Sequence, residues 1–135
     1  HEQVTRVPLI LSVPHHKPGR SQSIVELVDL YPTLSELTRL ETPKHVQGVS
    51  LLPILKDPTG TVKEGALSFA KGHSWRTKDW AYMRYTDGTE ELYDMKDDPE
   101  QFTNLAKVPE HADRRDAMAS ALDDRLKSAG ISSNG

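Results

Sequence analysis

The sequence predicts an α/β chain in two parts: the last strand and helix of a larger α/β domain, and a small antiparallel sheet packed by one helix. One observation is an apolar run followed by a loop and a helical pattern, which is half of a βαβ unit. The other is a stretch of alternating aromatic residues before an Asp-Gly pair, typical of a β-hairpin. We therefore divide the chain into residues 1–64, belonging to the α/β domain, and residues 65–135, a separate subdomain.

Residues 7–13 read Val-Pro-Leu-Ile-Leu-Ser-Val and predict a fully buried strand. A short apolar run between prolines is typical of a parallel sheet that is covered on both faces. One strand with its following helix cannot close a sheet. We therefore expect the rest of that sheet in sequence beyond these residues or in another chain.

A helix is predicted over residues 23–40. Ser23 and Glu26 have the spacing of a capping box. Pro32 interrupts the pattern, so we expect a kink or a fresh helix start with Pro32 in its first turn. Asp29 is predicted to cap the helix that begins near Pro32. Apolar residues recur at helical spacing at Ile24, Leu27, Val28, Tyr31, Leu34 and Leu37.

The second half is predicted to be a small sheet with one helix. After a loop-rich segment over 43–65, short β patterns cover 67–70 and 74–77. A hairpin follows, with strands 80–85 and 91–94 around the Asp87-Gly88 turn, and it is stopped by Pro99.

A final helix is predicted after Pro109-Glu110, with Gly130 at its end. Residues 131–135 are predicted to be a frayed tail. The apolar stripe of this helix comprises Ala112, Met118, Ala121, Leu122, Leu126 and Ala129.

Composition excludes several functional classes. The 135 residues include 17 basic and 20 acidic ones, giving a formal charge of −3 with the two signs interspersed, so we predict no nucleic-acid partner. No apolar run approaches the ~20 residues that span a bilayer, so we predict no membrane partner. The absence of cysteine excludes disulfides, cysteine zinc sites and thiol nucleophiles in these residues.

Several motifs, in order, resemble the type I sulfatases of the alkaline phosphatase superfamily, with the iduronate-2-sulfatase-like branch as the nearest match. The resemblance covers roughly residues 2–106. Its motifs are Arg6-Val7-Pro8-Leu9-Ile10, Asp29-Leu30-Tyr31-Pro32-Thr33, Gln47-Gly48-Val49-Ser50-Leu51, Glu91-Leu92-Tyr93-Asp94, Asp98-Pro99-Glu100 and Asn104-Leu105.

The resemblance implies an enzyme whose chemistry lies elsewhere. Such sulfatases hydrolyse sulfate esters with a formylglycine made from a Cys or Ser in a Cys/Ser-x-Pro-x-Arg motif, beside a calcium ion. This chain has no cysteine, and none of its serines begins a complete motif. No cofactor is therefore expected in these residues, while calcium and formylglycine are implied for the full-length enzyme. The resemblance also favours an exported or lysosome-like location.

His73 and Arg76 are the candidate substrate-binding residues, because they precede the hairpin in a segment that in the resembled family can overhang the active-site mouth. A guanidinium can bind a sulfate or carboxylate through two hydrogen bonds. The alternative is structural: Arg76 would pair with a hairpin carboxylate such as Glu91, and His73 would cap a loop. No catalytic residue and no metal ligand is predicted in this chain.

Other residues suggest chemistry but have a structural interpretation that we favour. His15-His16 is interpreted as a solvated loop rather than a metal pair, with a substrate contact as the alternative. Asp98 and its acidic neighbours lack the EF-hand pattern and predict a turn in which an Asp side chain binds the backbone. The aromatic residues are interpreted as core and cross-strand pairs rather than a sugar-stacking platform; they are Trp75, Trp80, Tyr82 and Tyr85.

The sequence thus predicts the C-terminal segment of a sulfatase, which completes the fold and walls the substrate pocket. Its partners would be the remainder of the catalytic domain and, in the full enzyme, a sulfated saccharide or other sulfate ester. The alternatives are a stand-alone binding or scaffold domain, or a fragment of a related phosphonate or phosphodiester hydrolase.

Overall fold

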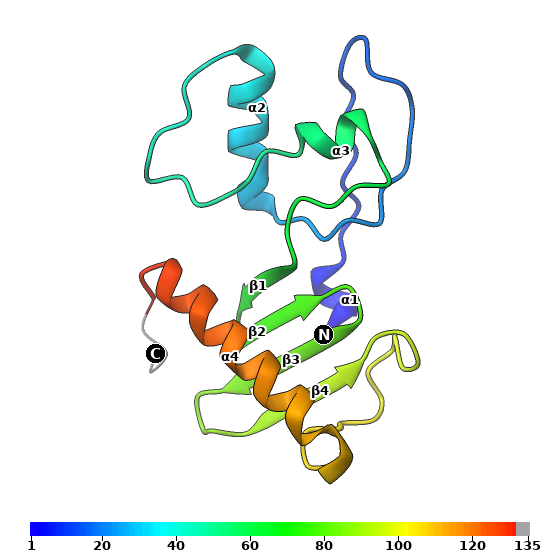
Figure 1. Cartoon of the computed structure of the whole chain (residues 1–135), viewed down its shortest axis with the longest axis vertical. Helices are drawn as coiled ribbons and strands as arrows, with labels where there is room; N and C mark the ends of the chain where they lie inside the picture. Colours follow the sequence, from blue (N-terminus) through cyan, green and yellow to red (C-terminus); the bar gives the residue numbers. More distant parts are fainter. Residues whose placement is uncertain (132–135) are drawn as a thin grey trace. The chain divides into compact units, whose positions relative to one another are not determined.

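The computed structural model describes residues 1–131, and these form two compact units (Figure 1). One unit comprises residues 8–66, and the other comprises residues 1–7 together with the described residues from Leu67 onward. The sequence analysis placed residues 1–7 with the first segment. In the structure they pack in the unit that contains the sheet.

The sheet is antiparallel and four-stranded, in the order β1 (Gly65–Phe69), β2 (Gly72–Thr77), β3 (Trp80–Tyr85) and β4 (Glu90–Asp94). The predicted hairpin is confirmed: β3 and β4 pair with Trp80 opposite Asp94 and Arg84 opposite Glu90. Gly88 has φ +82, the left-handed conformation that this tight turn requires.

One face of the sheet is covered by α4 (Ala112–Ser128), which follows the short 3₁₀ helix η2 (Pro109–His111). Figure 1 shows α4 lying across the strands. The predicted apolar stripe supplies the buried residues Met118, Leu122 and Leu126, which form one cluster with Trp75, Tyr82 and Leu92 of the sheet.

The predicted helix end and tail are partly as expected. Gly130 adopts φ +69 just after the helix. Ile131 is not frayed, because it packs against the helix–sheet cluster and its backbone N–H donates to the Leu126 carbonyl at 3.0 Å. The other tail residues, 132–135, lie outside the described residues.

The opposite face of the sheet carries a smaller cluster of Ala81, Met83, Tyr93 and Met95. The N-terminal helix α1 (Glu2–Thr5) belongs to the same unit, and the His1 ring lies 5.9 Å from the Tyr93 ring. The Glu2 backbone N–H donates to the Gln101 side chain at 2.7 Å. Residues 1–7 therefore lie on the face that α4 leaves open.

The unit of residues 8–66 contains η1 (Leu27–Asp29), α2 (Leu30–Thr38) and α3 (Leu52–Lys56). Pro32 lies in the first turn of α2, which confirms the predicted fresh helix start. The capping box is formed by Glu26 and Asp29, and not by Ser23 and Glu26. The helical region is thus 27–38, shorter than the predicted 23–40.

Residues 7–13 form no strand in the structure, which differs from the strand predicted there. The pairing of these residues with sequence beyond this chain stays a prediction. A strand exists only when its backbone pairs with a neighbour, and the sheet of the described chain is made entirely of β1 to β4. Val7 is 57% exposed and Ile10 is 89% exposed. The apolar run is therefore only partly covered among the described residues, with Leu11 and Val13 half-buried.

Candidate functional site

The two predicted site residues lie on β2, but on opposite faces of the sheet. His73 pairs with Arg84, and Arg76 pairs with Ala81. Positions separated by three residues along a strand point to opposite sides. Arg84 binds Asp123 of α4, whereas Ala81 belongs to the cluster on the other face. His73 and Arg76 therefore do not converge on one ligand in this structure.

Arg76 is held by a carboxylate and by backbone carbonyls. Its Nε donates to Glu2 Oε2 at 2.8 Å, and its Nη1 donates to the carbonyls of Thr77 and Lys78. The structural alternative expected a carboxylate on the hairpin, Glu91, whereas the partner is Glu2. Since Arg76 and Glu2 are both only 21% exposed, the pair is partly shielded from water.

His73 lies on the α4 side of the sheet, near the ion pair of Arg84 and Asp123. Its ring meets Phe69 edge-on at 5.3 Å between centroids. Arg84, the cross-strand neighbour of His73, donates to Asp123 at 2.5 Å. This hydrogen bond lowers the pKa of Asp123, and the charge of His73 acts in the same direction.

The aromatic residues of β2 and β3 are core residues, as the favoured interpretation held. Trp75 and Tyr82 are buried against α4. The Tyr82 hydroxyl donates to Glu90, and burial is the main cause that raises the Tyr82 pKa. Trp80 packs at the cluster's margin, with Arg114 over its ring at 5.2 Å. These rings do not form an open stacking platform.

Asp98 forms the predicted turn. Its carboxylate accepts hydrogen bonds from the backbone N–H groups of Phe102 and Thr103, at 3.1 and 2.8 Å, and these contacts lower its pKa. Gln101 takes a left-handed conformation within the turn, with φ +61. Both carboxylate oxygens of Asp98 are therefore engaged by the backbone.

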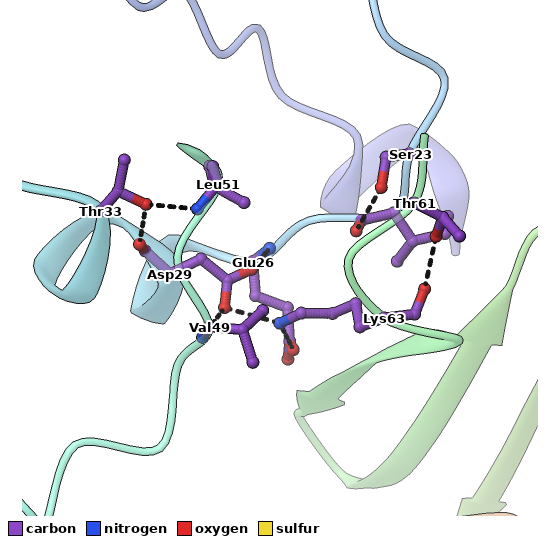
Figure 2. A network of polar contacts seen from close by, with 9 residues as sticks. Ser23, Glu26, Asp29, Thr33, Val49, Leu51, Thr61 and Lys63 are labelled. Carbon is purple, nitrogen blue, oxygen red and sulfur yellow. Dashed lines mark hydrogen bonds and ion pairs between the residues drawn. The ribbon is translucent and has the colours of Figure 1, made fainter. Parts of the chain in front are cut away.

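The most connected polar group is Asp29, which is fully buried (Figure 2). It precedes α2, but its side chain does not cap that helix. Its carboxylate accepts hydrogen bonds from the backbone N–H of Glu26 at 2.8 Å and of Val49 at 2.9 Å. Lys63 completes the group, with Nζ 2.7 Å from both Asp29 and Glu26.

This network joins two of the motifs on which the resemblance rests. Thr33 Oγ1 donates to the Asp29 carbonyl at 2.6 Å and accepts from the Leu51 N–H at 2.8 Å. A Cβ at Gly48 would lie 2.0 Å from the Val28 carbonyl oxygen, so only glycine permits this approach. No sequence pattern indicates the role of Lys63, because it lies 34 residues from Asp29.

An open pocket of about 450 Å³ lies in the same unit. Its lining comprises Val28, Tyr31, Pro43, His45, Val46 and Gln47.

The residues present do not fit a calcium ion or a formylglycine. Asp29, the buried carboxylate, is neutralised by Lys63 and already accepts two backbone hydrogen bonds. Within residues 1–131, no group of three His, Asp or Glu side chains could hold a metal ion. His16 contacts the Pro14 carbonyl through Nδ1 at 3.2 Å, as a loop residue would.

No helix within residues 1–131 is long and apolar enough to cross a membrane.

Known proteins are similar to this chain over most of its length. The model of the family described as "N-sulphoglucosamine sulphohydrolase, C-terminal" matches residues 1–128. Arylsulfatase K of Xenopus laevis is 31% identical over 147 residues, covering 94% of this chain and 27% of that protein. The chain thus spans about a quarter of the length of the curated relatives it matches.

Solved structures share the fold. A structure described as a 2-O GAG sulfatase is 29% identical with a TM-score of 0.67, covering 76% of this chain and 24% of that one. The phosphonate monoester hydrolase of Silicibacter pomeroyi has a TM-score of 0.76 at 20% identity, covering 87% and 28%. The matched residues, the paired motifs around Asp29 and the helix-backed sheet together place the chain in the N-sulphoglucosamine sulphohydrolase C-terminal family.

Proposed function

We propose that this chain is the C-terminal part of a sulfuric ester hydrolase, which completes the catalytic domain and walls one side of its substrate pocket. The observation that supports this most is the family match over residues 1–128, which is nearly the whole chain. The relatives are about four times longer, so the intact protein is expected to supply the remaining catalytic sequence.

The nucleophile and the metal would come from that remaining sequence. The chain has no cysteine and no complete Ser-x-Pro-x-Arg motif. In the intact protein a formylglycine would supply the nucleophile, and calcium would supply positive charge beside it. The residues described above bind neither, so their contribution is to shape and support the pocket.

The substrate class that we propose is a sulfated saccharide. A relative at 29% identity is described as a 2-O GAG sulfatase, which supports a polyanionic sugar substrate. An exported or lysosomal location would give access to such a substrate. Phosphonate ester hydrolysis is the second candidate, since the neighbour from Silicibacter pomeroyi shares the fold.

The substrate contact proposed for Arg76 is separable from its ion pair with Glu2. Arg76→Gln and Glu2→Gln both break that pair, but only the first removes a cation from the site. If Arg76 binds substrate, Arg76→Gln alone raises KM for a sulfated saccharide, by about tenfold for one lost charge-assisted contact. If Arg76→Gln and Glu2→Gln have equal KM values and equal losses of stability, Arg76 is a structural residue. The KM of His73→Gln, measured in the same assay, tests the substrate contact proposed for His73.

The proposed function is tested on the intact polypeptide that contains this segment. It is expected to release inorganic sulfate from an aryl sulfate, to lose that activity with a calcium chelator, and to act more slowly on a phenylphosphonate ester. Faster turnover of the phosphonate would favour the second candidate. No turnover of either ester would favour a stand-alone binding or scaffold domain.

A further inference from the structure

We propose that the loop of residues 14–20 is a binding surface for a second anionic group of the substrate, remote from the ester that reacts. This inference rests on the proposed function and adds to it a site outside His73 and Arg76. Lys17 and Arg20 are the residues that would carry it, with His15 and His16 beside them.

Charge is distributed unevenly around this loop. The chain as a whole has a formal charge of −3, yet no Asp or Glu occurs between Glu2 and Glu26. Lys17 and Arg20 are exposed, and within residues 1–131 neither has an ion-pair partner. By contrast, the arginines on the sheet are neutralised: Arg76 by Glu2 and Arg84 by Asp123. Residues 3–25 therefore carry positive charge only, on a chain that is negative as a whole.

The loop backbone is also constrained. Pro14 and Pro18 fix two of its φ angles. The His16 N–H donates to the Val13 carbonyl at 3.3 Å and closes a turn, in which His15 has φ +65. Gly19 packs so closely on Pro58 that a Cβ would lie 2.6 Å from Pro58 Cγ.

This constraint matters for binding. A loop whose shape is fixed before the ligand arrives loses less entropy when its side chains engage that ligand. Figure 1 shows the segment, in blue, as part of a long loop that turns back on itself. Two cations on such a loop suit a sulfate or carboxylate on a neighbouring sugar of a polyanionic chain.

The test compares two double variants of the intact protein. Lys17→Gln with Arg20→Gln removes two charges from the loop. Lys44→Gln with Lys56→Gln removes two exposed charges elsewhere in the same unit and is the matched control. Each variant is assayed with a polysulfated oligosaccharide and with a small aryl sulfate, and its retention on an immobilised sulfated polysaccharide is measured as the eluting salt concentration.

The loop variant is expected to raise KM for the oligosaccharide about three- to tenfold, with kcat/KM for the aryl sulfate unchanged and an earlier elution than the control. The difference should shrink at high ionic strength, because the contact is exposed and screened by salt. Equal KM and equal elution in the two double variants would overturn the proposal. If the intact protein hydrolyses neither ester, the proposed function fails, and the elution comparison still decides whether the loop binds a polyanion.

Discussion

At the scale of single residues, Asp29 has a role that its position in the sequence does not reveal. Its motif places an acid before a helix, where side-chain caps are common, so a cap was the natural prediction. In the structure the carboxylate takes part in the capping box of η1 through the Glu26 N–H, and it also binds Val49 and Lys63, which lie 20 and 34 residues away. Sequence spacing reports local partners only, and contacts at such separation depend on the tertiary fold.

Asp29→Asn is expected to lower the stability of the residue 8–66 unit by about 1–3 kcal/mol, because it leaves Lys63 with Glu26 as its remaining carboxylate partner and removes one of the two carboxylate oxygens that accept hydrogen bonds. The loss is measured as faster hydrogen exchange of the Val49 and Leu51 amides and as a lower Tm. Asp57→Asn is the control, since Asp57 is exposed and binds only its own turn at Thr59. Similar exchange in both variants would show that the network is dispensable.

Asp123 gives a pH-dependent prediction. Its pKa lies below the ordinary value of 3.8, mainly because Arg84 hydrogen-bonds the carboxylate. Because the Asp123 pKa is lower in the folded state than in the unfolded state, the ion pair stabilises the fold fully at pH values above the unfolded-state pKa. This stabilisation is lost as the pH falls through the folded-state pKa. Arg84→Gln should therefore raise the Asp123 pKa toward 3.8, as followed by NMR titration of the side-chain carboxyl. Arg125→Gln is the control and should leave the Asp123 pKa unchanged. If Arg84→Gln also leaves the Asp123 titration curve unchanged, Arg84 does not set this pKa.

At the scale of elements, the sheet and its helix were readable from the sequence, whereas the strand at 7–13 was not. The hairpin has a local cause, alternating side chains around Asp87-Gly88, and α4 has an apolar stripe that its own turns bring together. A strand in a parallel sheet has no local cause, because its partners come from distant sequence. The apolar composition of residues 7–13 indicates that they need cover, but not which strand provides it.

The α4–sheet interface gives a prediction at this scale. Leu122 is fully buried among Trp75, Tyr82 and Leu92, so Leu122→Ala should cost about 2–5 kcal/mol through lost burial and a residual cavity. Asp124→Ala, at an exposed position of the same helix, should change stability by less than about 0.5 kcal/mol. Chemical denaturation followed by tryptophan fluorescence reports both. Equal midpoints for the two variants would contradict the described packing.

The candidate site residues show the same difference between features with a local cause and features that depend on distant residues. The turn around Asp98 and the core role of the aromatics were predicted correctly, since each depends on residues close in sequence or on strand alternation. The carboxylate partner of Arg76 was misidentified, because Glu2 lies 74 residues away. His73 and Arg76 are three positions apart on one strand, and alternation alone would have separated them to opposite faces.

At the scale of the whole molecule, exposed apolar residues gather where partner sequence is expected. Leu27, Tyr31 and Leu34 share a face of η1 and α2 at helical spacing and are 55–68% exposed. Surfaces of this kind mark interfaces. In the intact protein these residues should be covered, and hydrogen exchange and chemical labelling of Tyr31 should show strong protection there. Labelling of Tyr31 at the same rate in the intact protein and in the 135-residue chain would contradict an interface at this face.

The central proposal is that this chain is part of a sulfatase whose catalytic centre lies in other sequence. The most direct measurement is sulfate release from an aryl sulfate by the intact polypeptide and, in parallel, by the 135-residue chain, followed by ion chromatography. The account predicts turnover by the intact polypeptide and none by the chain alone. Turnover by the chain alone, or an intact polypeptide that hydrolyses no sulfate ester, would contradict it.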